Sequence, residues 1–133
     1  MRVKRIGYIG VRTPDMERMT WFFRDVLGLA VAHTDQNYTV SSLPSGRFDF
    51  AEVYAPAHRD PRMIPNDADG IVVSFIVDDL KSALVEVQQA GLEIVGDVIW
   101  AAQAFEEPAM EGVGWFWVRA PDGRVYVIEQ SVD

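Results

Sequence analysis

One pattern occurs twice in this chain, and it limits the folds that the chain can adopt. Each copy runs from an apolar strand through an aspartate and an amphipathic helix to a glycine, over Tyr8–Gly28 and Val73–Gly91. The aspartates, Asp15 and Asp79, lie 64 positions apart in a chain of 133 residues. A repeat at about half the chain length predicts two similar halves.

Local residues predict where the two helices begin and end. In the first copy, Thr13 is a favourable N-cap and Pro14 suits the first helical position. In the second, the cap is Asp78 or Asp79. A glycine suited to a left-handed backbone comes after each helix. The apolar stripes at helical spacing are Met19, Phe22, Phe23 and Val26 in the first helix, and Leu80, Ala83, Leu84 and Val87 in the second.

The segments after each helix have the alternation and turn residues of strands. We expect strands over 29–34, 38–43 and 48–54, and then over 93–99, 115–119 and 124–130. Residues 101–114 are predicted to be an acidic loop. The prediction is one domain over 1–133, with a first module at 1–56, a connector at 57–70 and a second module at 71–133.

The composition of the chain excludes some kinds of functional site and disfavours some kinds of partner. The chain has no cysteine, which excludes disulfides, thiolate metal sites and a cysteine nucleophile. Its formal net charge of −8 favours cationic or neutral partners and disfavours nucleic acid and anionic membranes. No apolar run approaches the length of a membrane span, and no signal peptide is visible, so a cytoplasmic location is expected.

The element order, the segment VRTPDMERMTWFFRDVLGL and the ending RAPDGRVYVIEQ resemble the vicinal oxygen chelate superfamily. That superfamily includes glyoxalase I, bleomycin-resistance and fosfomycin-resistance proteins and extradiol dioxygenases. The resemblance implies an α+β fold of two tandem βαβββ modules, which form a curled mixed sheet around a shared cleft. It also implies a small-molecule ligand in the cleft and a homodimer.

The resemblance further implies a site for one divalent cation, with ligands on the first and last strands of each module. These positions fall on Tyr8, Glu52, Val72 and Val127. Valine cannot coordinate a metal, so we expect no metal and no other cofactor. A displaced site built from Glu52, Glu129 and His58 remains an alternative.

The strand faces predict which residues line the cleft. The candidate ligand-binding residues are Tyr8, Phe50, Glu52, Val72, Ser74, Phe116, Val127 and Glu129. A four-residue turn at Ala120–Gly123 sets Phe116 toward the cleft and Trp115 and Trp117 toward the helix. A turn one residue longer or shorter exchanges these faces.

The sequence supports three functional hypotheses. The first is a glyoxalase/bleomycin-resistance-like protein that binds a small aromatic or cationic molecule without a metal. The second is an enzyme of the superfamily (a lyase, isomerase or dioxygenase), with a displaced metal or with metal-free acid/base chemistry by Tyr8, Glu52 or Glu129. The third is a member without ligand or activity that acts through protein contacts.

Overall fold

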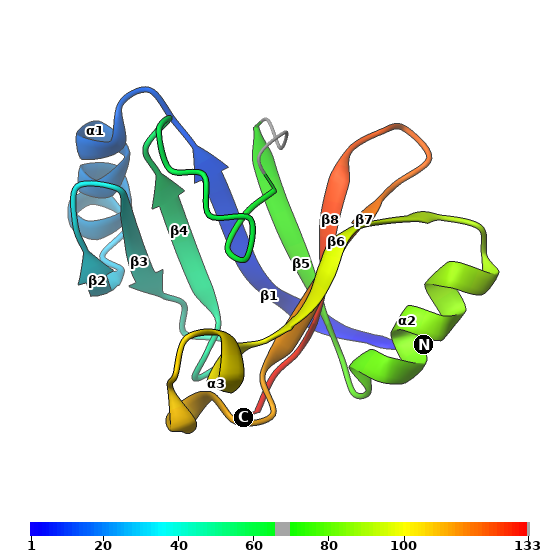
Figure 1. The fold of residues 1–133 in the computed structure, drawn as a ribbon. Coiled ribbons are helices and arrows are strands. Elements are labelled where there is room, and N and C mark those ends of the chain that lie inside the picture. The colour runs from blue at the N-terminus through cyan, green and yellow to red at the C-terminus, as the bar shows by residue number, and fades with distance from the viewer. Residues whose placement is uncertain (66–69, 133) are drawn as a thin grey trace.

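A single mixed sheet runs through the molecule and carries its two halves side by side (Figure 1). The computed structural model describes residues 1–65 and 70–132. The sheet has eight strands in the order β2-β3-β4-β1-β5-β8-β7-β6. Each half contributes four consecutive strands of this order, so the predicted α+β fold of two βαβββ modules is confirmed.

The first module begins with the long strand β1 (Val3–Arg12). The helix α1 (Met16–Trp21) continues into a π-helical turn, η1 (Phe22–Val26). The antiparallel strands β2 (Ala30–Thr34), β3 (Tyr38–Ser42) and β4 (Phe50–Tyr54) complete the module, and β4 pairs parallel to β1.

The second module repeats this order with an insertion. It consists of β5 (Ile71–Val77), α2 (Leu80–Gln89), β6 (Glu93–Trp100), β7 (Gly114–Arg119) and β8 (Val125–Gln130). Between β6 and β7 lie the short helices α3 (Ala101–Ala104) and η2 (Pro108–Met110), where the sequence predicted only a loop. The modules join through antiparallel pairing of β1 with β5, in which Tyr8 lies opposite Ser74 and Gly10 opposite Val72.

The helix ends agree with the predicted residues with one exception. Gly28 and Gly91 have φ of +73° and +78°, the left-handed conformation expected after each helix. Asp79 caps α2 by accepting the Ser82 N–H (3.1 Å). The first cap is Asp15, which accepts the Arg18 N–H (3.0 Å), and the prediction of Thr13 was wrong. The Thr13 N–H donates to the Tyr54 carbonyl (3.0 Å), which extends the β1–β4 pairing by one residue before the helix.

The turn between β7 and β8 is shorter than predicted. The Ala120 N–H donates to the Arg124 carbonyl (2.7 Å), and Gly123 has φ of +88°, so three residues form the loop. Three-residue hairpin loops commonly place glycine at such a position. The shorter loop sets Trp117, not Phe116, opposite Val127. Phe116 therefore faces α2 and the tryptophans face the other side, so the predicted faces were wrong.

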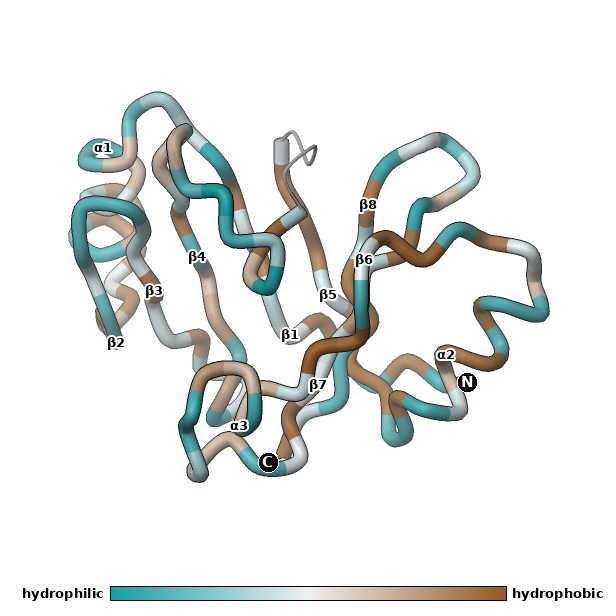
Figure 2. The backbone as a smooth tube through the Cα atoms, in the orientation of Figure 1, coloured by the Kyte–Doolittle hydropathy of each residue, from teal (hydrophilic) through white to brown (hydrophobic). Residues whose placement is uncertain are grey.

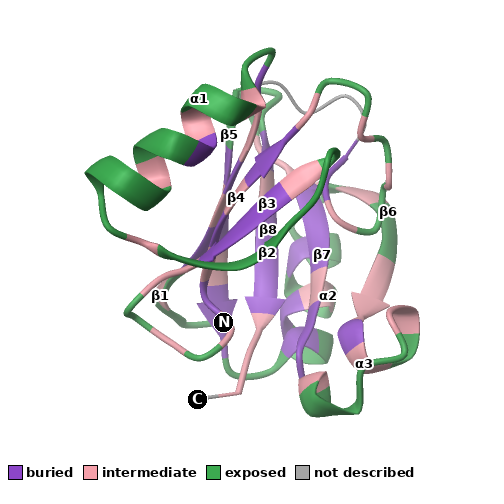
Figure 3. Ribbon diagram, turned by 90° about the vertical axis from the view of Figure 1, so that its left-hand side faces the viewer, coloured by how far each residue is buried: buried purple, intermediate pink, exposed green. Residues whose placement is uncertain are grey.

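The two helices pack very differently against the sheet (Figure 3). Seven buried residues form a core between α2 and its strands: Val77, Leu80, Ala83, Val87, Phe116, Val118 and Ile128. Figure 2 shows hydrophobic residues along the strands of this second module. In α1 only Thr20 is buried, and in η1 no residue is. None of the helices in the described ranges is long and apolar enough to cross a membrane.

Candidate functional site

The two halves of the sheet enclose a cavity of about 520 Å³. Its lining comes from both modules, from the connector and from the segment that holds α3 and η2. The described lining residues are Tyr8, Ala32, His33, Tyr38, Val40, Phe48, Phe50, Glu52, Met63, Phe105, Glu107, Met110, Val113, Trp115, Trp117, Val127 and Glu129. The lining is rich in aromatic rings, and none of these residues is a lysine or arginine.

On the first-module wall, Glu52 belongs to a hydrogen-bonded chain of hydroxyl groups. The Tyr54 hydroxyl donates to Glu52 Oε2, and the Tyr8 hydroxyl donates to the Tyr54 hydroxyl (3.3 Å). Tyr54 is fully buried, whereas Glu52 is only half-buried because its side chain borders the cavity. The two phenols therefore hold a carboxyl group at the cavity wall.

On the second-module wall, Glu129 has a simpler partner. The Ser74 hydroxyl donates to Glu129 Oε2 over 2.8 Å, and both residues are buried. Ser74 lies on β5 and does not itself line the cavity. Each module thus supplies one carboxyl group, and in each module a hydroxyl group of the same module holds it.

Both carboxyl groups hold their protons more tightly than an ordinary glutamate. Burial raises the pKa of Glu52 to about 7, against hydrogen bonds from Tyr54 and Tyr8 that lower it. Burial also raises the pKa of Glu129 to about 7, and the nearby charges of Asp49 and Glu52 add to the effect. Burial likewise raises the pKa of Tyr8 well above its ordinary value. A cation entering this cavity would favour the ionised carboxylates.

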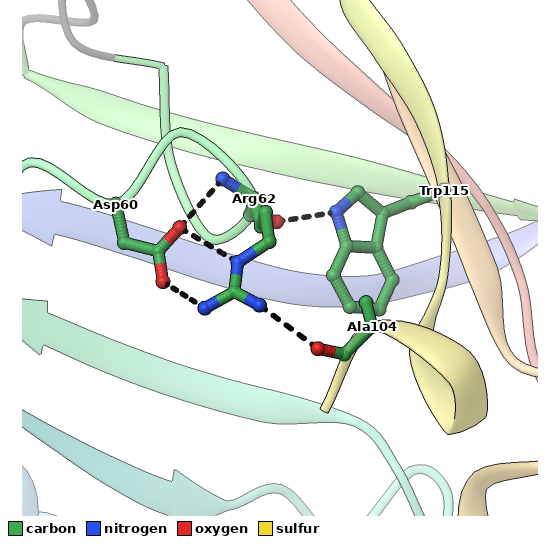
Figure 4. A network of polar contacts seen from close by, with 4 residues as sticks. All are labelled: Asp60, Arg62, Ala104 and Trp115. Atoms are coloured by element: carbon green, nitrogen blue, oxygen red, sulfur yellow. Dashed lines mark hydrogen bonds and ion pairs between the residues drawn. The ribbon is translucent and has the colours of Figure 1, made fainter. Parts of the chain in front are cut away.

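A polar network joins the connector to the second module beside the lining residue Trp115 (Figure 4). The Arg62 guanidinium pairs with both oxygens of Asp60 and donates to the Ala104 carbonyl (2.8 Å). The Trp115 indole donates to the Arg62 carbonyl (2.9 Å), and the guanidinium lies over the Phe105 ring (4.8 Å). Arg62 therefore ties the connector to two aromatic walls of the second module.

The predicted ligand-binding residues divide into three groups. Tyr8, Phe50, Glu52, Val127 and Glu129 line the cavity together. Val72 packs in the same buried cluster as Tyr8, and Ser74 holds Glu129, so both lie directly behind the lining. Phe116 lies on the opposite side of the sheet, because the β7–β8 loop is one residue shorter than predicted.

Sequence reasoning missed part of the lining. Trp115 and Trp117 were assigned to the wrong face, although the glycine at position 123 is a recognisable sign of the shorter loop. Phe105 and Met110 come from a segment without strand or long-helix periodicity, so no pattern in the sequence could place them.

The residues present do not fit the metal site that the fold implies. Val72 and Val127 carry no donor atom, and Tyr8 and Glu52 are engaged with Tyr54. Across residues 1–65 and 70–132, no three histidine, cysteine, aspartate or glutamate side chains are grouped to hold a metal ion. The alternative ligand His58 instead stacks on Tyr54 (5.0 Å between ring centroids).

A comparison of the sequence with models of protein families identifies the family of this chain. Residues 5–123 match the model of the glyoxalase/bleomycin resistance protein/dioxygenase superfamily. The chain belongs to this superfamily. No curated protein matches it. The family therefore rests on most of the chain length, and it agrees with the resemblance found in the sequence.

Several solved structures share the fold of this chain at low sequence identity. The Mn(II)-bound glyoxalase from Novosphingobium aromaticivorans gives a TM-score of 0.69 at 18% identity, covering 97% of this chain and 39% of that one. A homoprotocatechuate 2,3-dioxygenase variant from Brevibacterium fuscum gives 0.70 at 17% identity, covering 98% and 33%. Methylmalonyl-CoA epimerase from Streptomyces coelicolor gives 0.66 at 15% identity, covering 99% and 100%.

These likenesses establish the fold of this superfamily member and nothing about its reaction. The chain spans about two fifths of the Novosphingobium glyoxalase and a third of the Brevibacterium dioxygenase, but all of the Streptomyces epimerase. One scaffold carries several chemistries, so the function must be argued from the cavity itself.

Proposed function

We propose that this protein binds a small aromatic or cationic molecule in the cavity between its modules, and that it does so without a metal. The observation that carries the proposal is the pairing of two carboxyl groups, Glu52 and Glu129, with an aromatic lining that contains no lysine or arginine among the described residues. The cavity thus offers negative charge and aromatic faces but no cation of its own.

The charge of the cavity favours a cationic ligand. Glu52 and Glu129 have pKa values of about 7, so at neutral pH each carries its charge only part of the time. A bound cation favours the charged form and lowers both pKa values, so binding releases protons below pH 7. Affinity for a cation should fall as pH drops below about 7 and level off above it.

The aromatic lining favours a planar ligand. Tyr38 and Phe50 line the first-module wall, and Trp115 and Trp117 line the second. Aromatic rings attract a cation over their faces and stack on planar molecules, worth about 0.5–2 kcal/mol for each contact. A volume of about 520 Å³ lies within the range of sites for small organic ligands.

Binding can be tested with N-methylquinolinium, a planar aromatic cation, and with quinoline above pH 8, a neutral molecule of similar shape. We expect the cation to quench tryptophan fluorescence and to raise the melting temperature, since a ligand at about 100 times its Kd stabilises by roughly 2.7 kcal/mol. Glu52→Gln should weaken binding of the cation, whereas Glu17→Gln, on the exposed surface of α1, should not. Equal affinity for both probes, or unchanged binding to Glu52→Gln, would contradict the cationic part of the proposal.

Metal independence has its own test. Elemental analysis of protein purified without added metal should find no stoichiometric zinc, iron, manganese or nickel. We expect this result because the two valines leave too few donors at the positions that the fold provides. A metal at one equivalent per chain would overturn this part of the proposal.

One observation favours a second candidate function. Two carboxyl groups with pKa values of about 7 face one cavity, and a group with a pKa near the working pH transfers protons well. Glu52 and Glu129 could therefore exchange a proton with a carbon acid. Deuterium uptake from D₂O by candidate carbon acids, measured by mass spectrometry, would reveal this activity, and Glu52→Gln and Glu129→Gln should abolish it.

We also propose that the protein is a homodimer and resides in the cytoplasm. The α1 and η1 helices expose an apolar stripe of Trp21, Phe22, Val26 and Leu27 beside the free edge strand β2. Exposed stripes of this kind mark protein interfaces.

A further inference from the structure

The Tyr8 side chain lies along its own strand and covers Gly10. A Cβ atom added at Gly10 would lie 1.8 Å from the Tyr8 hydroxyl oxygen and 2.4 Å from Cζ. Contacts this short do not occur between non-bonded atoms, so the tyrosine ring occupies the space that a side chain at position 10 needs. Both residues are buried, and Tyr8 packs in the cluster with Val72 and Trp117.

The strand pairing explains what this arrangement achieves. Tyr8 lies opposite Phe50 on β4, whereas Gly10 lies opposite Glu52. By bending over Gly10, the Tyr8 ring carries its hydroxyl two residues along β1, to the level of Glu52. There the hydroxyl donates to Tyr54, and its hydrogen bonding lowers the pKa of Glu52.

The second module reaches a similar result with a different residue. Position 74 corresponds to position 10 by the 64-residue repeat, and Ser74 donates directly to Glu129 over 2.8 Å. The position equivalent to Tyr8 is Val72, which has no hydroxyl. The first module therefore has a hydroxyl group at position 8 and none at position 10. The second module has a hydroxyl group at position 74, which corresponds to 10, and none at position 72, which corresponds to 8.

We propose that Gly10 is a positioning residue of the cavity: its lack of a side chain lets Tyr8 lie over it and place a hydroxyl at Glu52. Backbone conformation does not require glycine here, since Gly10 is not among the glycines with positive φ. The requirement is for space. The consequence for ligand affinity rests on the proposed function, but the placement of the hydroxyl does not.

The carboxyl titration of Glu52 tests the placement without any ligand. In ¹³C NMR titrations, with Glu52→Gln identifying the signal, Gly10→Ala should raise the Glu52 midpoint by about one pH unit, because the Tyr8 hydroxyl leaves the hydrogen-bonded chain that runs through Tyr54 to Glu52 and favours the charged form. Tyr8→Phe should raise it similarly. In a Tyr8→Ala background, Gly10→Ala should add no shift, since no ring is left to displace.

Gly7→Ala is the matched control, because it adds the same methyl group at another buried glycine of β1. Its Cβ would meet the Ile76 side chain (2.3 Å) and Asp49, not Tyr8, so the Glu52 midpoint should stay unchanged. An unchanged midpoint in Gly10→Ala would overturn the proposal. So would an equal shift from Gly10→Ala with and without the Tyr8 side chain.

A binding measurement extends the test to the ligand. If N-methylquinolinium binds the wild-type protein, Gly10→Ala should weaken it about tenfold through the raised Glu52 midpoint, with the loss greatest at pH 6 and smallest above pH 8. A loss of affinity that is independent of pH would contradict the proposed positioning role of Gly10. If this cation does not bind the wild-type protein at all, the cationic part of the proposed function fails, while the titration still decides the role of Gly10.

Discussion

The two modules share one order of elements but build their helix layers in different ways. The second module packs α2 on the sheet through a continuous core that includes Leu80, Val87 and Phe116, all nearly or fully buried. The first module places Thr39, Ser41 and Ala51 on the buried side of its strands, and Thr20 of α1 reaches them through a hydrogen bond to Thr39 (3.2 Å). A repeated fold therefore does not imply repeated energetics.

The difference comes from where the apolar residues of each helix point. In α2 they recur at helical spacing and enter the core, as the sequence predicted. In the first helix the turn widens to a π-helix, in which the Leu27 N–H donates to the Phe22 carbonyl (3.0 Å). Of the predicted apolar stripe, Phe22 and Val26 are 38% and 54% exposed, and Met19 and Phe23 are half-buried. We infer that packing of α2 stabilises the fold more than packing of α1 and η1 does.

Truncating one phenylalanine in each helix layer should show the largest contrast. Phe116→Ala removes a fully buried ring from the α2 core and should lower the free energy of unfolding by about 3–5 kcal/mol. Phe22→Ala removes an exposed ring and should change it by less than about 1 kcal/mol. Urea denaturation at low protein concentration measures both. Comparable losses would show that α1 and η1 contribute as much packing as α2.

The next prediction concerns the buried carboxyl groups and the pH dependence of folding stability. Glu129 has a folded pKa of about 7 against an ordinary value of 4.5, so between these values the folded state binds more protons than the unfolded state. Stability linked to this group is therefore present below about pH 4.5 and is lost as pH rises through about 7. Burying the charged form at high pH opposes folding.

Glu129→Gln should accordingly stabilise the protein at pH 8 by about 1–3 kcal/mol and have little effect at pH 5. The amide oxygen can still accept the Ser74 hydrogen bond, so packing is largely kept. Glu17→Gln, on the exposed face of α1, is the control and should show no such pH dependence. A stability gain that is equal at both pH values would mean that the Glu129 carboxyl titrates normally.

Much of the fold could be predicted from the sequence because its determinants are local. The aspartates at 15 and 79, the glycines at 28 and 91 and the alternation of the strands each act within a few residues. The first cap lies two residues later than predicted because the strand pairing continues through Thr13, whose N–H donates to the carbonyl of Tyr54, 41 positions away. Local patterns cannot show a strand partner that only the tertiary structure brings close.

The candidate site was harder to predict for the same reason. Tyr8 and Glu52 could be placed on the cavity by strand alternation, but their hydrogen-bonded partner Tyr54 depends on side-chain direction. One residue of turn length decided the faces of Trp115, Phe116 and Trp117. Phe105 lines the cavity from a segment whose position depends on contacts with Arg62 and Trp115.

The last prediction concerns the exposed apolar residues of the helices. Replacing them should have the smallest effect on the stability of a single chain, and it tests the difference between the two helix layers most sharply. Leu27 and Val85 are 52% and 49% exposed, one on the first helix layer and one on α2. Replacing either with serine should change the free energy of unfolding of dilute protein by no more than about 0.5 kcal/mol.

The same two substitutions test the proposed dimer. If a second copy packs on the stripe of Trp21, Phe22, Val26 and Leu27, Leu27→Ser should shift the mass measured by light scattering from two chains toward one, and Val85→Ser should not. A wild-type mass of one chain at high concentration would show that this face has no partner of its own kind.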